Sequence, residues 1–193
     1  LGTEVVVIEA MDRILSNMDK EIGQNLKIIM KKRGVTIHTQ AILEKIWEDN
    51  GLHCAFLAKG ERQEIEAEAV LMAAGRKAYT KGLFGDGIAV EMEHDKIKVN
   101  KNFQTNYDNI YAVGDVIGGI SLAHMASAEG INAVCHMNGE EQVMNLGTVP
   151  YCVYTNPEIA CVGMTAQEAK DCGIEAATSK YLMSANGKSL LTG

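Results

Sequence analysis

The stretch Glu4-Val5-Val6-Val7-Ile8-Glu9 decides the fold class. It places four β-branched residues in a row and closes them with a carboxylate, which is typical of a strand buried on both faces in a parallel sheet. We expect a crossover helix to follow, with Asp19 as its N-cap, apolar residues at helical spacing and Gly34 as its stop. Residues 35–39 then alternate as a second strand. Strand, helix and strand in this order predict an α/β protein.

An antiparallel insertion is predicted after this unit. Asn50-Gly51, a strong hairpin signal, joins the alternating residues 44–49 to residues 52–57. Further strands are expected in three apolar or alternating runs, and the first, Ala69-Val70-Leu71-Met72, reads as buried. The three runs are residues 69–72, 97–99 and 109–113.

Two helices are predicted in the second half of the chain. Residues 122–137 carry small residues such as Ala126 on a closely packable surface and stop at Asn138-Gly139. A composition shift near Gly147, where the two prolines bracket an aromatic β-type run, indicates the start of a new domain. Its helix is expected over residues 165–172, where Thr165 and Glu168 form a capping box.

Composition excludes several classes of function. The 193 residues carry 18 Lys and Arg against 25 Asp and Glu, and the formal charge of −7 argues against nucleic acid or an anionic membrane as the main partner. Apolar residues make up 47% and charged residues 22%, and no apolar run approaches the roughly 20 residues of a membrane helix. The five cysteines form neither a disulfide ladder nor a CxxC metal site. We therefore expect reduced thiols and a cytoplasmic location.

The two ends of the sequence suggest an incomplete protein. Leu1 is not an initiator Met, no signal-peptide pattern follows it, and the chain stops at Gly193 without a tail. We expect a fragment of a longer chain that holds one or two domains, or parts of more.

Glu9 is the first candidate site residue. An acidic residue at the carboxyl end of the second strand of a doubly wound sheet accepts hydrogen bonds from the adenosine ribose of NAD, and it repels the 2′-phosphate of NADP. A solvated Glu at a strand end is the alternative interpretation. The GxGxxG phosphate loop that should come about 20 residues earlier is not in the sequence.

Gly114-Asp115 is the second candidate. A Gly that lets the backbone approach, followed by an Asp at the end of a buried strand, suits a carboxylate bound to a cofactor hydroxyl at the carboxyl edge of the sheet. An ordinary Asp in a turn remains the alternative. The helix beginning at Leu122 would add a positive dipole end just downstream. A single His124 on an apolar helix is more often a hydrogen-bonded structural residue than a base or a ligand.

Three ordered motifs resemble a known family. They are Asn109-Ile110-Tyr111-Ala112-Val113-Gly114-Asp115-Val116, Leu122-Ala123-His124-Met125-Ala126-Ser127-Ala128-Glu129-Gly130 and Val149-Pro150-Tyr151-Cys152-Val153-Tyr154-Thr155-Asn156-Pro157-Glu158-Ile159-Ala160. Together they resemble the dihydrolipoamide dehydrogenases, flavin enzymes of the pyridine nucleotide-disulfide oxidoreductases. The likeness runs through the whole chain. The implied fold is α/β, with partial FAD/NAD(P)-binding Rossmann-like domains followed by the start of an α+β interface (dimerisation) domain.

The resemblance implies domains and cofactor-binding residues. Residues 1–78 would be the later part of the NAD domain, 79–147 the second segment of the FAD domain, and 148–193 the start of the dimerisation domain. Glu9 would bind the adenosine ribose of NAD, Ala41 would lie beside the adenine, and Gly75 would approach the nicotinamide half. Asp115, with Gly114, would bind the ribityl and pyrophosphate region of FAD. The helix facing the flavin pyrimidine edge would open with Ser121, Leu122, Ala123 and His124.

The resemblance also implies an activity. The whole enzyme would oxidise dihydrolipoamide, carried by the lipoyl domain of a multienzyme complex, and pass electrons through a disulfide and FAD to NAD, as a homodimer. The sequence contains no CxxxxC and no carboxy-terminal His-Glu pair, so we assign no catalytic residue and no metal ligand to this chain and expect it to be inactive alone. Ala78-Tyr79 and Asn186-Gly187-Lys188-Ser189 depart from the family pattern.

Two other functions fit the same residues. One is another NADH- or NADPH-dependent disulfide or mercuric reductase of the superfamily, which differs in its preferred substrate. The other is a non-catalytic nucleotide-binding module that uses the same sheet.

Overall fold

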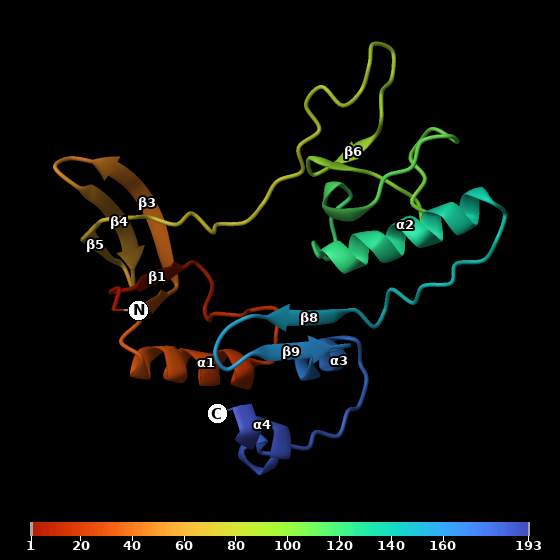
Figure 1. Cartoon of the computed structure of the whole chain (residues 1–193). Coiled ribbons are helices and arrows are strands. Elements are labelled where there is room, and N and C mark those ends of the chain that lie inside the picture. Colours follow the sequence, from red (N-terminus) through yellow and green to blue (C-terminus); the bar gives the residue numbers. More distant parts are fainter. Residues whose placement is uncertain (1, 193) are drawn as a thin grey trace. The chain divides into compact units, whose positions relative to one another are not determined.

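The computed structural model describes residues 2–192 (Figure 1). The chain forms two compact units, one made of the residues up to Leu71 together with those from Met164 onward, and the other of Met72–Gly163. The elements in chain order are β1 (Val6–Glu9), α1 (Lys20–Lys32), β2 (Thr36–Thr39), β3 (Ala41–Glu48), β4 (Leu52–Ala58), β5 (Glu61–Ala67), β6 (Met92–Glu93), β7 (Lys96–Ile97), η1 (Gly114–Val116), α2 (Ala123–Met137), β8 (Pro150–Val153), β9 (Ile159–Val162), α3 (Ala166–Asp171), η2 (Met183–Ala185) and α4 (Gly187–Thr192). The predicted domain boundaries after residues 78 and 147 remain predictions.

The first unit contains the predicted strand–helix–strand. β1 and β2 pair in parallel from Val6 with Thr36 to Glu9 with Thr39, and α1 connects them. Lys27 of α1 donates from Nζ to Oγ1 of Thr39 at 3.1 Å, which ties the helix to the end of β2. β1 is half-buried, whereas we predicted burial on both faces, because only β2 pairs with it among residues 2–192.

The start of α1 differs in one contact from the prediction. Asp19 occupies the N-cap position, but its side chain makes no capping hydrogen bond. Its Oδ1 instead accepts the N–H of Ala166 at 3.1 Å, at the first residue of α3. Lys180 adds an ion pair with Glu21 at 2.5 Å. The start of α1 is therefore a docking point for the carboxy-terminal segment rather than a self-capped helix end.

The predicted capping box of α3 is confirmed. The Thr165 side chain accepts the Glu168 N–H at 3.2 Å, and Glu168 Oε2 accepts the Thr165 N–H at 2.8 Å. The backbone hydrogen bond from Thr165, followed by the one from its hydroxyl, lowers the pKa of Glu168 below its ordinary value. The helix spans Ala166–Asp171, and Gly173 follows it with a φ of 70°.

An antiparallel three-stranded sheet completes this unit. The predicted hairpin is present as β3 and β4, with Asn50 and Gly51 both at positive φ, and a third strand, β5, extends it beyond the prediction. Phe56 of β4 is fully buried. It packs with the buried or partly buried apolar residues Ala41, Ala58, Ile8 and Ile65. Three of these partners come from other strands, Ala41 from β3, Ile65 from β5 and Ile8 from β1, and the cluster therefore holds the sheet against β1.

The strand predicted over residues 69–72 is wrong. These residues form no strand, and Leu71 is 90% exposed. An extended segment becomes a strand only when a neighbour accepts and donates its backbone hydrogen bonds, and in the described part of the chain no strand pairs with this one. Apolar composition alone therefore misled the assignment.

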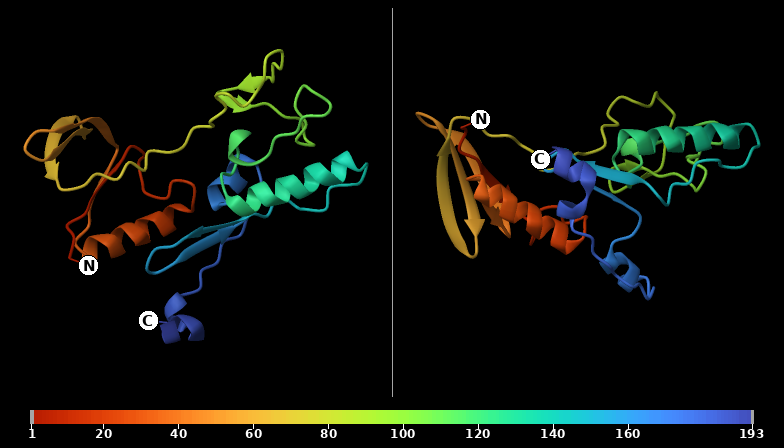
Figure 2. Two further views of the ribbon diagram at one scale, coloured as in Figure 1. Left: turned by 45° about the horizontal axis from the view of Figure 1, so that its top comes forward. Right: turned by 60° about the horizontal axis from the view of Figure 1, so that its bottom comes forward.

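The second unit contains less sheet than predicted. Residues 109–113 form only an isolated bridge between Gln104 and Tyr111 instead of a strand, because the ladder stops after one pair. The strand predicted over residues 97–99 appears as the two-residue β7, paired with β6. A core of Val90, Ile97 and Ala112 replaces the missing ladder. β8 and β9 form a hairpin, whose two adjacent arrows are labelled in Figure 1. Both views of Figure 2 show the green helix of this unit, α2 (Ala123–Met137).

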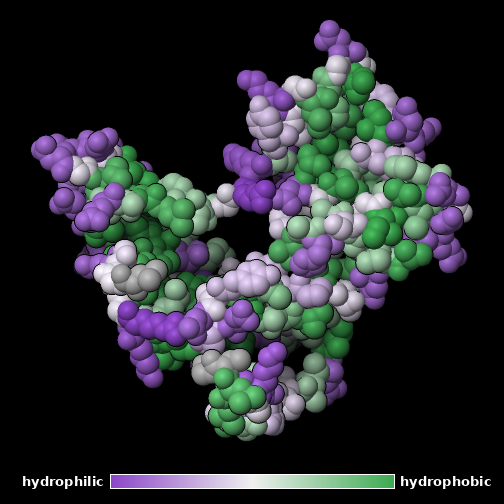
Figure 3. Space-filling model, viewed as in Figure 1, coloured by the Kyte–Doolittle hydropathy of each residue, from purple (hydrophilic) through white to green (hydrophobic). Residues whose placement is uncertain are grey.

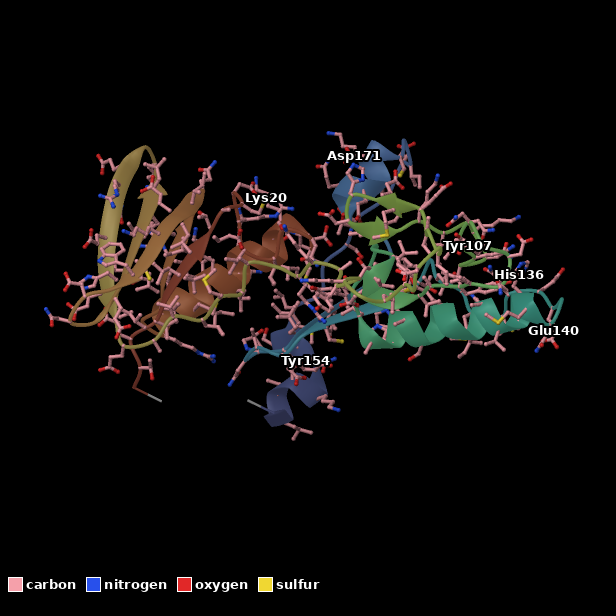
Figure 4. The ribbon with its side chains drawn as sticks, turned by 90° about the horizontal axis from the view of Figure 1, so that it is seen from above. Lys20, Tyr107, His136, Glu140, Tyr154 and Asp171 are labelled. Atoms are coloured by element: carbon pink, nitrogen blue, oxygen red, sulfur yellow. The ribbon has the colours of Figure 1, made fainter. Side chains whose placement is uncertain are left out.

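α2 is the longest helix among residues 2–192 and agrees with the prediction. It runs from Ala123 to Met137 and ends where Asn138-Gly139 was expected to stop it. Gly139 has a φ of 73°, and the N–H of Glu140, just beyond the helix end in Figure 4, donates to the Cys135 carbonyl at 2.9 Å. This left-handed glycine followed by a backbone bond into the last turn is a Schellman-type stop.

Apolar side chains also reach the surface, as the green areas of Figure 3 show. They include Leu71, Tyr154, Leu182 and Leu191. No helix in the part of the chain that the structure describes is long and apolar enough to cross a membrane.

We expect Phe56→Ala to lower the free energy of unfolding of the first unit by about 3–5 kcal/mol, because a fully buried ring leaves a cavity when it is removed. Urea unfolding followed by the fluorescence of Trp47, the single tryptophan, in the neighbouring strand β3, measures the change. Leu57→Ala is the control, since Leu57 is the next residue of β4 and is exposed. Equal losses for the two variants would contradict this account of the core.

Candidate functional site

The first unit places Glu9 at the end of the parallel strand pair. Glu9 is the last residue of β1, opposite Thr39, the last residue of β2. Its Oε1 accepts the N–H of Met11 at 2.8 Å, and the Met11 carbonyl accepts the N–H of Gln40 at 2.8 Å. These two bonds draw the chain after β1 and the chain after β2 together. The edge is the carboxyl edge of the parallel pair, where open α/β sheets bind ligands.

Ala41 lies next to Gln40 at the start of β3, so the structure brings it to the same edge as Glu9. Its side chain is buried against Phe56. Ala41 therefore presents no side chain to a ligand in this conformation. A role beside an adenine remains a prediction that rests on the backbone at this position.

The second unit places Gly114 and Asp115 in the single-turn helix η1. Gly114 has a φ of 78°, in the left-handed region that favours glycine, and its N–H donates to Oε2 of Glu129 at 2.6 Å. A Cβ added at Gly114 would lie 2.9 Å from the Cβ of Ala126 in α2. The predicted close packing on the small-residue surface of α2 is therefore realised here: the turn can touch the helix because glycine leaves room.

Glu129 is a residue that the sequence reasoning missed. It lies in α2 and is only 4% exposed. A buried carboxylate is costly unless it is hydrogen-bonded, and the Gly114 N–H supplies a short bond to it. The sequence feature that could have pointed to it is a charged residue between Ala128 and Gly130, on a helix surface of small residues. Its partner could not be read from the sequence, since the two residues are 15 positions apart.

Asp115 forms an ion pair with Arg76, which the sequence reasoning also did not connect. NH2 of Arg76 lies 3.2 Å from Oδ2 of Asp115, and the two side chains are 82% and 38% exposed. Arg76 follows Gly75, whose φ of 105° turns the chain at that point. An added Cβ at Gly75 would meet nothing within 4 Å, so the space beside this predicted nicotinamide-facing residue is open.

The start of α2 holds the other four predicted residues. Ser121 is exposed, Leu122 is the N-cap, and Ala123 and His124 begin the helix. No side chain caps this helix end. The first backbone N–H groups of a helix point outward without intrahelical partners, so this end can receive a polarised or anionic group.

His124 has a structural partner, as the residue pattern favoured. Its Nε2 donates to the Pro150 carbonyl at 2.8 Å, which attaches the start of α2 to β8. The ring is therefore engaged in a fixed hydrogen bond. Among residues 2–192 no group of three His, Cys, Asp or Glu side chains is arranged to hold a metal ion.

The predicted site residues thus form two groups. Glu9 and Ala41 share an edge in the first unit, whereas Gly75, Gly114, Asp115 and the start of α2 belong to the second. Each group has the chemistry of half a nucleotide site: a carboxylate for hydroxyls, beside backbone that a ligand can approach.

We expect Gly114→Ala to destabilise the second unit by about 1–3 kcal/mol, because alanine is strained at this φ and its methyl would collide with Ala126. Urea unfolding followed by circular dichroism measures the loss. Gly130→Ala in the middle of α2 is the matched control. An added Cβ there meets nothing within 4 Å, and alanine favours the helix by up to ~1 kcal/mol. A Gly114 variant as stable as the Gly130 variant would contradict the close contact.

Comparisons with known proteins match both parts of the chain. Residues 1–130 match the family model described as pyridine nucleotide-disulphide oxidoreductase. Residues 149–193 match the dimerisation domain of pyridine nucleotide-disulphide oxidoreductases. A dihydrolipoyl dehydrogenase of Bacillus subtilis (strain 168) is 38% identical over 192 residues, which are 99% of this chain and 42% of that protein. The chain therefore spans about two-fifths of the length of this curated relative.

Solved structures agree. LpdA from Mycobacterium tuberculosis aligns with a TM-score of 0.85 at 25% identity, over 99% of this chain and 42% of that one. The HOCl-induced flavoprotein disulfide reductase RclA from Escherichia coli aligns with a TM-score of 0.82 at 25% identity, over 99% and 44%. The α/β fold, an FAD/NAD-binding region followed by the start of a dimerisation domain, is that of part of a flavoprotein disulfide reductase. Since the first model covers more than half of its residues, the chain belongs to the pyridine nucleotide-disulphide oxidoreductase family.

Proposed function

We propose that this chain is part of a flavin-dependent dihydrolipoyl dehydrogenase, which oxidises dihydrolipoamide and reduces NAD. The observation that carries the proposal is the Gly114–Asp115 turn, held by buried Glu129 beside the uncapped start of α2. The name of the Bacillus subtilis relative supports the choice of substrate.

The residues of the second unit fit a flavin nucleotide. The Asp115 carboxylate is partly exposed and can accept hydrogen bonds from ribityl hydroxyls, while the start of α2 offers unpaired N–H groups to the pyrimidine edge. Glu129 keeps the turn in place, and the His124–Pro150 bond keeps the helix start in place. When bound, FAD would supply the electron transfer between thiols and the nicotinamide that no side chain can perform.

The residues of the first unit fit NAD. Oε1 of Glu9 is oriented by the Met11 N–H, which leaves the second carboxylate oxygen for the hydroxyls of an adenosine ribose. The same negative charge would repel a 2′-phosphate. We assign the backbone at Ala41 to the adenine. Gly75, which belongs to the second unit and has open space beside it, is the residue we assign to the nicotinamide half.

The family model of the dimerisation domain supports a homodimer, and the proposed substrate is the lipoyl domain of a multienzyme complex. The net charge of −7 supports neither nucleic acid nor an anionic membrane as a partner. The five cysteines, all within the described residues, form no disulfide with one another, which favours a reducing compartment such as the cytoplasm.

A second candidate is a different disulfide or metal-ion reductase of the same family. The likeness to RclA, also solved as a Cu(II) complex, favours it. The two candidates differ in substrate, and both use the same nucleotide sites.

The test of the proposed function is substrate preference in the product of the full reading frame. We expect NAD reduction with dihydrolipoamide to exceed NADH oxidation with glutathione disulfide, Hg(II) or Cu(II), measured by absorbance at the nicotinamide band. The 193-residue chain assayed alongside should be inactive, because it contains no CxxxxC pair to exchange with a thiol. Preference for a metal ion would replace the proposed function with the second candidate. Turnover by the 193-residue chain would contradict our expectation that the reaction needs a CxxxxC pair that this chain does not contain.

Glu9→Gln tests the NAD site. Without the charge, we expect the full-length protein to bind NAD about tenfold more weakly and to lose most of its discrimination against NADP, since a charge-assisted hydrogen bond and a like-charge repulsion disappear together. Isothermal titration with both nucleotides measures the ratio. Glu4→Gln, an exposed change of equal charge just before β1, should leave that ratio unchanged. An unaltered ratio in the Glu9 variant would remove Glu9 from the site.

A further inference from the structure

A cavity of about 230 Å³ lies between the loop that follows β1 and the first two turns of α1, within the first unit. Gly23 of α1 lets the loop come this close, because an added Cβ would collide with the carbonyl oxygen of Ile14. The lining contains three cationic side chains and one anionic one, so its formal charge is +2. The polar residues that line the cavity are Asp12, Arg13, Lys20, Gln24 and Lys27.

The two lysines of the cavity have no carboxylate partner. Lys20, Gln24 and Lys27 follow one another at spacings of four and three residues, which places them on one face of α1. Lys20, labelled in Figure 4, is exposed and forms no ion pair within residues 2–192. Lys27 donates to the hydroxyl of Thr39 at 3.1 Å, and this neutral partner leaves the ammonium charge uncompensated.

The carboxylates near the start of α1 are bonded away from the cavity. Asp19 accepts an N–H of α3, and Glu21 pairs with Lys180. Asp12 is the one carboxylate in the lining. Its Oδ2 lies 3.8 Å from NH1 of Arg13, which is a long ion pair, and its side chain is 59% exposed. The acidic residues therefore leave a net positive charge in the cavity.

Arg13 has a donor that the protein leaves unused. Its NH2 group donates to the carbonyls of Ser16 at 2.9 Å and Met18 at 3.5 Å, which fixes the side chain against the loop. Its Nε is buried and has no hydrogen-bond partner among residues 2–192. A guanidinium that is only partly satisfied by the protein is stabilised when an anion lies beside it.

A phosphate group has the chemistry that this cavity would recognise. Ammonium and guanidinium groups bind phosphate oxygens through charge-assisted hydrogen bonds, and the amide of Gln24 can add a neutral donor. The chain as a whole has a charge of −7, so its surface does not attract anions in general and a local cluster is needed to hold one. A water occupies about 30 Å³ of liquid volume, and the cavity is several times larger, which leaves room for a phosphate group.

We propose that Arg13, Lys20 and Lys27 form a pocket for a phosphate group, either inorganic phosphate or the head of a small phosphate monoester. None of the residues predicted to bind a nucleotide lines the cavity, so the pocket is additional to the proposed NAD site. A bound phosphate would tie the loop after β1 to α1. The proposal does not depend on the proposed function, because it uses only the charges and donors of this cavity.

The test is a calorimetric titration of the full-length protein with sodium phosphate, at an ionic strength held constant with sodium chloride. We expect saturable binding at one site with a Kd on the order of 1 mM. Lys20→Gln and Lys27→Gln should each weaken this binding about tenfold, the effect of losing one charge-assisted contact. Lys32→Gln, the matched control, removes the same charge in the last turn of α1 and should stay within about twofold of the wild type.

A parallel titration with methyl phosphate distinguishes the two sources of the phosphate group. Equal binding of methyl phosphate and inorganic phosphate would support a monoester as the ligand. Binding of inorganic phosphate alone would support the free ion.

Three results would overturn the proposal. The first is no saturable binding up to about 10 mM phosphate, tenfold above the expected Kd. The second is a pair of lysine variants that bind phosphate as the wild type does, with folds confirmed by circular dichroism. The third is competition between phosphate and NAD or NADP, which would make the cavity part of the nucleotide site. An unchanged Kd for NAD in saturating phosphate supports a separate pocket, and a protein that binds phosphate but no NAD would overturn the proposed function alone.

Discussion

The hydrogen bond from the Gly114 N–H to the buried carboxylate of Glu129 is the contact on which the candidate flavin site depends. The carboxylate cannot be buried without a donor, and the turn cannot approach α2 unless residue 114 lacks a Cβ, since Ala126 occupies that space. The Gly114 N–H is the donor that the Glu129 carboxylate needs, and the missing Cβ of Gly114 lets the turn come close enough to α2 to donate it. The position of Asp115, the next residue, follows from this pair of constraints, although residues 109–113 before it do not form a strand.

The two candidate half-sites each contain a carboxylate with one oxygen engaged within the protein, but the charges around the two carboxylates differ. Glu9 and Asp115 each follow an extended segment, and each has one carboxylate oxygen engaged within the protein, by the Met11 N–H and by Arg76 respectively. Engagement of one oxygen orients the side chain and leaves the other oxygen to accept a ligand hydroxyl. The difference lies in charge: Asp115 is paired with the guanidinium of Arg76, whereas Glu9 forms no ion pair within residues 2–192.

The predictions that failed have a common physical origin. The Asn50–Gly51 hairpin and the capping box of Thr165 were predicted correctly because both depend on residues within a few positions of each other. The strand over residues 69–72 was predicted from apolar composition, but a strand exists only through its hydrogen-bonded neighbour. β1 was also predicted from its apolar residues, to be buried on both faces. It is half-buried, because only β2 pairs with it among residues 2–192.

The sequence by itself determined the local elements, the strand–helix–strand order and, through three ordered motifs, the family. Glu9, Gly114 and Asp115 were also predicted as site residues this way, from strand ends and from a glycine that lets the backbone approach, and their roles remain predictions. Only the tertiary structure decided which distant groups complete them: Glu129 beneath Gly114, Arg76 beside Asp115, and Asp19 bonded to the start of α3, 147 positions away. No periodicity or spacing records such pairs, because hydrogen bonds and charges act through space and not along the chain.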